Sequence, residues 1–274
     1  MAVWRRACKE KALKARPPVR RYGCMNTATT NIIRLPFLLV GFKAYVQGTG
    51  KNALKLARMA KRASARTGIS IVPIPQFTDI AVISRQVSMP VFAQHIDPIQ
   101  PGAYTGHVLP EAVRDAGAAG TLINHSERRL QLGQIEVAVR RAREVGLLSC
   151  VCSDGPELSA AVSAFGPDII LVENPGLIGR GRAISNAEPE IIRGTLEAVK
   201  AVNPDICVVC GAGISDAEDV AAALRLGMEG VGATSAIIKS ADPYRVMFEM
   251  AQALGSNWRG KRRILYPPRH ANAL

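Results

Sequence analysis

The sequence predicts a single-domain α/β protein with the fold of a (β/α)8 barrel. From residue 36 onward, short runs rich in Val, Ile and Leu alternate with helical patterns rich in Ala, Arg and Glu. This alternation is typical of repeated βα units around a parallel sheet. The chain has 274 residues, of which 48% are apolar, enough for one large core. About 250 residues is also the usual size of such a barrel.

Eight βα units follow one another along the chain. The strands are expected near residues 37–41, 69–73, 91–94, 120–124, 147–152, 169–173, 207–211 and 230–233. The helices between them are expected near residues 50–67, 77–86, 109–116, 131–145, 156–164, 188–202, 216–226 and 243–254. An open doubly wound sheet usually has about five or six strands, so eight consecutive units favour a closed barrel.

The formal charge of +13 is concentrated at the two ends of the chain. Residues 1–24 hold eight Lys and Arg against Glu10, and residues 250–274 hold five against no acid, which leaves a net +1 for residues 25–249. We therefore expect a basic N-terminal extension over 1–34, the barrel over 35–255 and a basic tail over 256–274. Short charged extensions are usually solvated and disordered.

An alternative interpretation is that these tails bind nucleic acid or an anionic surface. Its supporting feature is Trp258 and Tyr266 interleaved with a cluster of bases, Arg259, Lys261, Arg262 and Arg263. Lys and Arg side chains would bind a phosphate backbone through release of its counterions.

The sequence also indicates where the protein works. No stretch approaches 18 uninterrupted apolar residues, so no membrane span is expected. Residues 1–24 contain neither Ser nor an apolar segment, which fits no organelle address or secretory signal, and Met25 could be the true start. We expect a cytoplasmic protein.

The six cysteines do not predict disulfides or a metal site. Cys207 and Cys210 are three residues apart in a predicted strand, which places their thiols on opposite faces. Cys150 and Cys152 share a face, but no His or second Cys pair is near them in the sequence, so they are expected to be core residues.

Three polar residues each follow a different predicted strand. Lys43 comes after the first strand, His125 after the fourth and Glu173 after the sixth. The loops that follow the strands of a barrel meet at one end, where active sites lie. A cation, a proton donor and a carboxylate base are therefore expected to converge on one small ligand.

Small residues dominate the loops after the last three strands: Gly179-Arg180-Gly181, Gly211 to Ser215, and Gly232 to Ala236. Such loops let backbone N–H groups approach an anion, and the last two loops of a barrel commonly hold a phosphate. A barrel acting on a different phosphorylated sugar or an indole-type ligand would share this feature.

Residues 35–254 resemble the triosephosphate isomerase family, specifically its short archaeal-type branch. The matching stretches are Gly41 to Tyr45, Gly102 to His107, Asn124 to Glu127, Glu173 to Gly181, Gly211 to Ile214, and Thr234 to Ala236 with Lys239, Asp242 and Pro243. The resemblance implies a TIM barrel that interconverts dihydroxyacetone phosphate and D-glyceraldehyde 3-phosphate without cofactor or metal. It also implies a homotetramer, with a dimer as the alternative.

The resemblance further implies a role for each site residue. Glu173 would move the proton between carbons, and His125, kept neutral near a helix N-terminus, would polarise the carbonyl. Lys43 would stabilise the developing oxyanion, and Glu127 would hold Lys43 in place. Substrate contacts are implied for Gly41, Phe42, Lys43, Ile178, Gly179, Gly213, Thr234 and Ser235. The loop Asn174 to Gly181 would close over the ligand.

The chain departs from the family pattern within the site. Gly41 stands where the family has Asn, Asn174 where it has Pro, Gly176 where a larger residue is usual, and Arg180 where a small Thr is usual. Loss of the Asn side chain and of the stiff Pro predicts a looser loop and slower turnover. Arg180 either reaches the phosphate or points to solvent. If the site is merely detuned, the double change Gly41→Asn and Asn174→Pro should raise activity.

Overall fold

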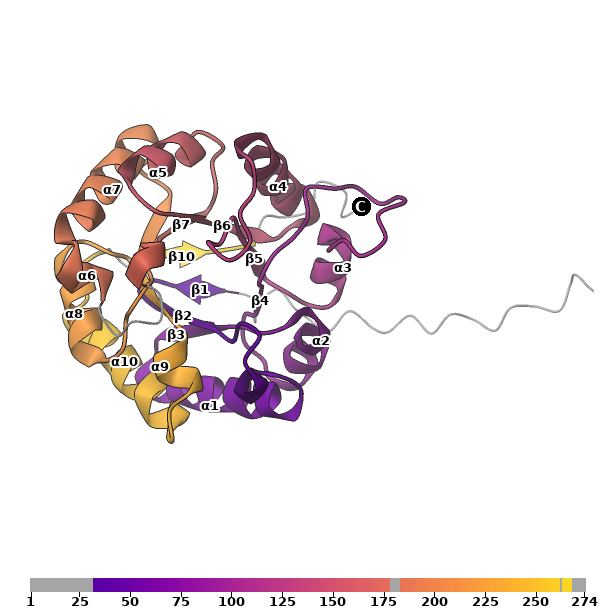
Figure 1. Ribbon diagram of the computed structural model, residues 1–274. Coiled ribbons are helices and arrows are strands. Elements are labelled where there is room, and N and C mark those ends of the chain that lie inside the picture. Colours follow the sequence, from indigo (N-terminus) through magenta and orange to yellow (C-terminus); the bar gives the residue numbers. More distant parts are fainter. Residues whose placement is uncertain (1–31, 178–182, 262, 268–274) are drawn as a thin grey trace, which may run out of the picture.

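The computed structural model describes residues 32–177, 183–261 and 263–267, and its centre is a ring of parallel strands (Figure 1). The strands are β2 (Phe37–Gly41), β3 (Ser70–Ile74), β4 (Phe92–Ala93), β5 (Gly120–Ile123), β6 (Leu148–Ser153), β7 (Ile169–Val172), β8 (Cys207–Cys210) and β9 (Gly230–Ala233). They form one eight-stranded sheet in the order β3-β2-β9-β8-β7-β6-β5-β4. The sheet curls into a nearly closed (β/α)8 barrel, which confirms the predicted fold class.

Helices surround the strands (Figure 1). The larger ones are α1 (Lys51–Thr67), α2 (Phe77–Gln86), α3 (Pro110–Asp115), α4 (Leu132–Val145), α5 (Pro156–Ser163), α7 (Pro189–Val202), α8 (Ala217–Arg225) and α10 (Pro243–Asn257). Each lies where the sequence predicts one. Short helices that were not predicted interrupt the loops: η2 (Val46–Gly48), η3 (Pro175–Leu177), α6 (Ile184–Ala187) and α9 (Ser235–Ile238).

Local signals explain where several helices begin and end. The Asp216 side chain accepts hydrogen bonds from the N–H groups of Glu218 and Asp219 and so caps the start of α8. Helices α1 and α4 end at Gly68 and Gly146, which adopt left-handed backbone angles with φ of 73° and 79°. Glycine takes this conformation without the steric cost that a Cβ would bring.

Side chains alternate between the inside and the outside of the barrel along each strand. In β2, Phe37 and Leu39 belong to the inner core cluster, whereas Leu38 and Val40 pack outward against the helices. In β8 the same alternation places Cys207 inside and Cys210 outside, as predicted from their spacing. Cys150 and Cys152 both face inward, and the four cysteines in the described part of the chain are buried and free.

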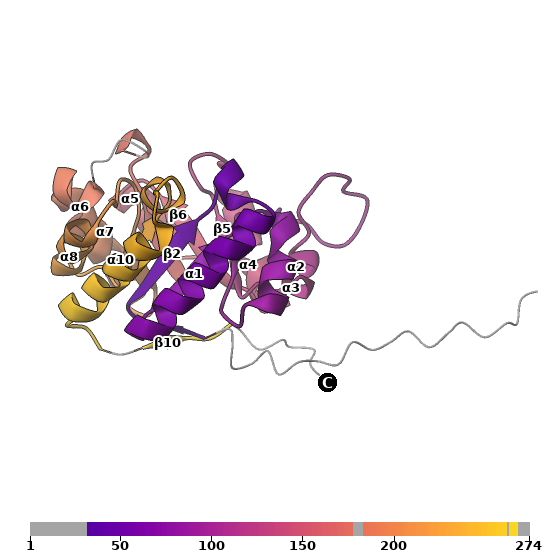
Figure 2. The same cartoon turned by 90° about the horizontal axis from the view of Figure 1, so that it is seen from below.

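A two-stranded ribbon covers the end of the barrel opposite the loops that follow the strands (Figure 2). Strand β1 (Ile33–Arg34) pairs antiparallel with β10 (Ile264–Leu265), and Ile33 and Leu265 join the inner core cluster. Trp258 packs against the same cluster. Residues from the segments expected to be extension and tail therefore take part in the fold, although the sequence analysis did not predict these strands.

Two side chains of the basic tail make contacts with the barrel. The partly buried Trp258 side chain packs against the inner core cluster, and the Arg263 guanidinium donates a hydrogen bond of 2.6 Å to the Asp205 carbonyl. Tyr266 is 58% exposed. No helix within the described ranges is long and apolar enough to cross a membrane.

Candidate functional site

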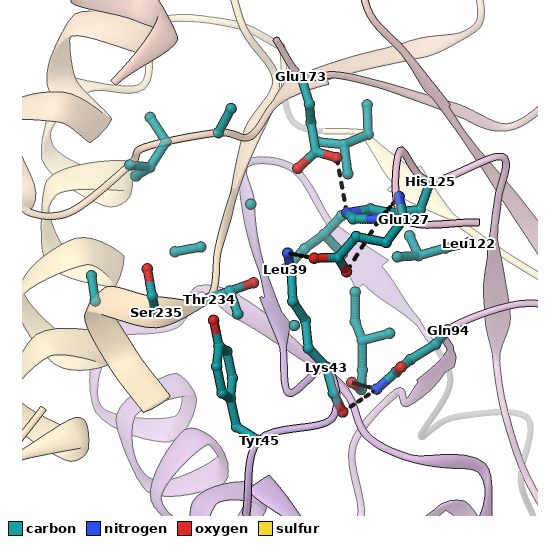
Figure 3. A pocket seen from close by; sticks show the side chains of 18 of the residues that line it. Leu39, Lys43, Tyr45, Gln94, Leu122, His125, Glu127, Glu173, Thr234 and Ser235 are labelled. Carbon is teal, nitrogen blue, oxygen red and sulfur yellow. Dashed lines mark hydrogen bonds and ion pairs between the residues drawn. The ribbon is translucent and has the colours of Figure 1, made fainter. Parts of the chain in front are cut away.

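The carboxyl ends of the strands surround a pocket of about 590 Å³. Lys43, His125, Glu127 and Glu173 all line it, although they lie up to 130 residues apart in the sequence. Figure 3 shows their side chains directed toward one another. The convergence predicted from the strand ends is therefore present in the structure.

Lys43 follows β2 with a strained backbone. Its φ is 48°, which a residue with a side chain rarely adopts. Two amide side chains hold the Lys43 carbonyl in place, because Gln76 Nε2 donates to it over 2.7 Å and Gln94 Nε2 over 2.9 Å. The ammonium group lies 2.9 Å from Glu127 Oε1, in agreement with the predicted pairing.

His125 follows β5 in a tight turn, and the Asn124 side chain holds this turn to its neighbours. Asn124 Nδ2 donates to the Cys152 carbonyl, and its Oδ1 accepts from the Leu130 N–H. The backbone N–H of Glu127 donates to Nδ1 of His125 over 3.2 Å. A hydrogen bond accepted at Nδ1 corresponds to the tautomer with the ring proton on Nε2, and Glu127 Oε2 also lies 3.7 Å from Nδ1.

The group that lies against the His125 ring differs from the one expected. We predicted that His125 lies near a helix N-terminus, but α4 begins only at Leu132. The backbone amide of Glu127, in the turn after β5, lies against Nδ1 instead of a helix N-terminus. The reason is that residues 125–128 close a turn of their own, with the Arg128 N–H donating to the His125 carbonyl.

Glu173 follows β7, and its side chain is 13% exposed. Oε2 lies 3.3 Å from Nε2 of His125. Burial raises the pKa of Glu173, while His125, Lys43 and the Ala212 amide oppose part of that rise. The carboxyl group also rests against Gly211, where an added Cβ would collide with it. These features are typical of a general base whose proton affinity is increased by removal from water.

The loops after β8 and β9 offer donors to an anion. Ala212 and Gly213 both have left-handed backbones, with φ of 61° and 79°, and Ser235 is the first residue of α9. Within the described residues, the N–H groups of Gly213 and Ser235 have no hydrogen-bond partner. Lys239 adds a positive charge, and its ammonium group lies 4.8 Å from the centre of the Tyr45 ring.

Some of the residues predicted to contact the substrate line the pocket, and others do not. Gly41, Lys43, Gly213, Thr234 and Ser235 line the pocket. Phe42 does not, because its side chain points outward into the core between strands and helices and is 1% exposed. Successive residues of a strand point to opposite faces, and that alternation continues past the end of β2. Ile178, Gly179 and Arg180 lie outside the described residues.

Sequence reasoning missed several residues that build the pocket. Gln94 and His95 come directly after β4 and line it, so the rule that selected Lys43, His125 and Glu173 would have found them. His95 Nε2 lies 3.1 Å from Asp97 Oδ1, and burial lowers the pKa of His95. Gln76 follows β3 by two residues, as Lys43 follows β2, so the same rule would have found it.

Asn174, at the start of the loop after β7, is held by hydrogen bonds. Its Nδ2 lies 2.8 Å and 2.7 Å from the two carboxylate oxygens of Glu188, and its Oδ1 accepts from the Gly176 N–H over 2.7 Å. An added Cβ at Gly176 would stand 3.1 Å from that Oδ1. These side-chain contacts hold the described start of the loop at the position where the family has a proline ring.

Comparison with known proteins agrees with this geometry. The family model described as triosephosphate isomerase matches residues 36–253. The triosephosphate isomerase of Methanosarcina barkeri is 44% identical over 220 residues, which cover 80% of this chain and 99% of the relative. The enzymes of Methanosarcina mazei and Methanocaldococcus jannaschii are each 47% identical, over 76% and 74% of this chain and 94% and 93% of their own lengths. The matched segment spans the eight-stranded barrel and the residues that line its pocket.

Proposed function

The chain belongs to the triosephosphate isomerase family, and we propose that Glu173, His125 and Lys43 carry out its reaction in the pocket described above. The enzyme interconverts dihydroxyacetone phosphate and D-glyceraldehyde 3-phosphate. One observation carries the assignment of roles: the Glu173 carboxylate, the His125 imidazole and the Lys43 ammonium group line one pocket of about 590 Å³ beside unpaired backbone amides of the described residues.

Glu173 acts as the base that moves a proton between neighbouring carbons. Its carboxylate takes a proton from the carbon next to the carbonyl, which gives an enediolate, and returns that proton to the other carbon. Burial raises the pKa of this carboxyl group above its usual 4.5, so the ionised form is a stronger base than a solvated glutamate. Contact with Gly211 fixes where the carboxylate stands.

His125 donates from Nε2 to the oxygens of the reacting carbons. The Glu127 amide occupies Nδ1, so the only ring proton points into the pocket toward Glu173. A neutral imidazole is a weak acid, and it can hydrogen-bond the enediolate oxygens while moving a proton from one of them to the other.

Lys43 provides a fixed positive charge for the oxyanion of the enediolate. The strained backbone, clamped by Gln76 and Gln94, and the contact with Glu127 hold the ammonium group before substrate arrives. A pre-organised charge avoids reorganisation during the reaction and stabilises the charged intermediate more than water would.

The phosphate of the substrate binds at the loops after β8 and β9. The amides of Gly213, Thr234 and Ser235 face this region, and Lys239 balances the negative charge. Ile178 and Gly179 complete the proposed contacts from the loop after β7. Holding the phosphate in place keeps it from being expelled from the enediolate.

We also propose that the enzyme is a cytoplasmic homotetramer, with a dimer as the alternative. The loop before α3 supports self-association, because residues 101–107 are exposed and the loop projects from the barrel (Figures 1 and 2). Tyr104 on this loop is 48% exposed. The mass of the purified protein, measured by light scattering after size-exclusion chromatography, distinguishes four, two and one copies.

The experiment that tests the proposed roles is a coupled assay with glyceraldehyde 3-phosphate. Glu173→Gln keeps the shape of the side chain and removes the base, so kcat should fall by about 10²–10⁴-fold. Glu190→Gln on α7, a carboxylate already in contact with solvent, is the matched control and should behave like the unmodified protein. Equal activity of the two variants would reject the role of Glu173.

A further inference from the structure

Gly41 and Thr234 stand side by side at the ends of two neighbouring strands. Strand β2 pairs in parallel with β9, and Val40 is opposite Ala233, so the next residues along each chain are Gly41 and Thr234. A Cβ added at Gly41 would lie 2.6 Å from Oγ1 of Thr234. Carbon atoms do not approach a hydroxyl oxygen so closely without displacing it. The Thr234 hydroxyl therefore occupies the space that a side chain at position 41 would need.

This hydroxyl is presented to the pocket. Gly41 and Thr234 both line it, and Figure 3 shows the Thr234 oxygen on the side of the pocket that holds Lys43. Thr234 immediately precedes α9, but its side chain does not cap this helix, and within the described part of the chain its Oγ1 has no hydrogen-bond partner. A threonine hydroxyl is both a donor and an acceptor. It is therefore available to a ligand in a place where β2 offers no side chain.

We propose that the Thr234 hydroxyl is a substrate-binding group of this enzyme, and that it replaces from β9 the polar side chain that Gly41 does not supply from β2. It donates a hydrogen bond to an oxygen of the triose phosphate beside Lys43. Gly41 and Thr234 form a matched pair, since any larger residue at 41 excludes the hydroxyl. This role rests on the proposed function and adds a side-chain contact to the backbone amide already assigned to Thr234.

Thr234→Val tests the hydroxyl, because valine keeps the branched shape and removes the polar group. Loss of one hydrogen bond to the substrate should lower kcat/KM by about tenfold. Thr234→Ser retains a hydroxyl and should lose much less. Thr195→Val, at a buried threonine of α7 that does not line the pocket, measures the effect of this exchange on folding alone and should leave kcat/KM unchanged.

A double-mutant cycle tests the pairing. Gly41→Asn alone should lose activity, because the new side chain collides with the Thr234 hydroxyl. In the combination Gly41→Asn with Thr234→Ala the collision is absent, so kcat/KM should exceed that of Gly41→Asn by about tenfold or more. Thermal melting of each variant separates loss of function from loss of folding. The inference would be overturned if the losses in kcat/KM caused by Gly41→Asn and Thr234→Ala simply multiplied in the double variant. It would also be overturned if Thr234→Val were as active as the Thr195→Val control.

Binding of glycerol 3-phosphate, an unreactive analogue of the triose phosphates that lacks the carbonyl group, keeps this test separate from the proposed function. Calorimetric titration should give a Kd that is severalfold higher for Thr234→Val than for the unmodified protein. If the unmodified protein turns over substrate but Thr234→Val binds and reacts normally, only the hydroxyl contact is wrong. If turnover is absent while Thr234→Val still weakens binding, the proposed reaction is wrong and the contact stands.

Discussion

The backbone amide of Glu127 donates a hydrogen bond to Nδ1 of His125, while Nε2 of the same ring lies 3.3 Å from the Glu173 carboxylate. In the proposed mechanism this amide fixes which ring nitrogen carries the proton and which one meets the substrate. Because this donor belongs to the backbone, no substitution at position 127 other than proline removes it. The Glu127 side chain is left to contact Lys43.

The first prediction concerns the proton of His125. Nitrogen NMR of the unliganded enzyme should show Nε2 protonated and Nδ1 unprotonated, since the Glu127 amide needs a lone pair on Nδ1. The spectrum of a His125→Asn variant identifies the signals by their loss. A ring that carries protons on both nitrogens would contradict the proposed electrophile.

The second prediction is a pH dependence set by Glu173. Burial raises the pKa of this carboxyl group, so the acidic limb of the kcat/KM profile should lie above the value of 4.5 that is usual for glutamate. Activity is lost as pH falls through the raised pKa, because the protonated carboxyl group cannot accept a proton. An acidic limb at or below the usual value would refute this account of the base.

The same raised pKa predicts how stability changes with pH. A folded-state pKa above the unfolded one stabilises the protein below the unfolded pKa, and this contribution is lost as pH rises through the folded pKa. Glu173→Gln has no charge to bury. As pH rises from the unfolded to the folded pKa of Glu173, the free energy of unfolding of Glu173→Gln should therefore increase relative to that of the unmodified protein. Above the folded pKa the difference between the two proteins should stay constant. Urea titrations at several pH values measure the difference.

The third prediction concerns Asn174. Its three contacts, two with Glu188 and one with the Gly176 N–H, replace the ring of the proline found in the family. Asn174→Pro would remove all three, so we expect a severalfold lower kcat rather than a gain. Asn203→Ala, which removes a side-chain contact with the Asp205 N–H beyond the end of α7, is the control and should keep full activity. A faster Asn174→Pro enzyme would show that these contacts do not support turnover.

The fourth prediction concerns the ribbon below the barrel. Leu265 is 9% exposed and belongs to the inner core cluster, whereas its neighbour Ile264 is 37% exposed. Leu265→Ala should cost about 2–4 kcal/mol of unfolding free energy, and Ile264→Ala about 0.5 kcal/mol or less. Urea unfolding compares the two variants. Equal effects would mean that β10 does not seal the barrel.

Much of the fold follows from the sequence because each βα unit carries its own signal. The bounds of β2 and α2 agree with the predicted ranges, and the other barrel strands differ by one residue at most. Strands buried on both faces read as apolar runs, and the helices between them have polar outer faces. The pair β1 and β10 was missed because two-residue strands that lie far apart in the chain carry no periodic pattern.

The candidate site was predictable where a residue ends a strand. Lys43, His125 and Glu173 were found in this way. The outward direction of Phe42 was also predictable, because successive side chains along β2 alternate between the inside and the outside of the barrel. The consequences of the departures at Gly41 and Asn174 were not predictable. Each depends on a partner brought close only by folding, Thr234 for Gly41 and Glu188 for Asn174. In the sequence alone, each departure is only the loss of a family side chain. The structure shows which residue lies against the changed position.

Isomerisation followed by proton NMR in D₂O tests the central claim most directly. If the Glu173 carboxylate carries the proton between carbons, glyceraldehyde 3-phosphate should be converted to dihydroxyacetone phosphate with deuterium on carbon, as the carboxyl proton exchanges with solvent. Glu173→Gln should reduce this conversion by about 10²–10⁴-fold while leaving the protein folded. Conversion by Glu173→Gln at the rate of the unmodified enzyme would contradict the account.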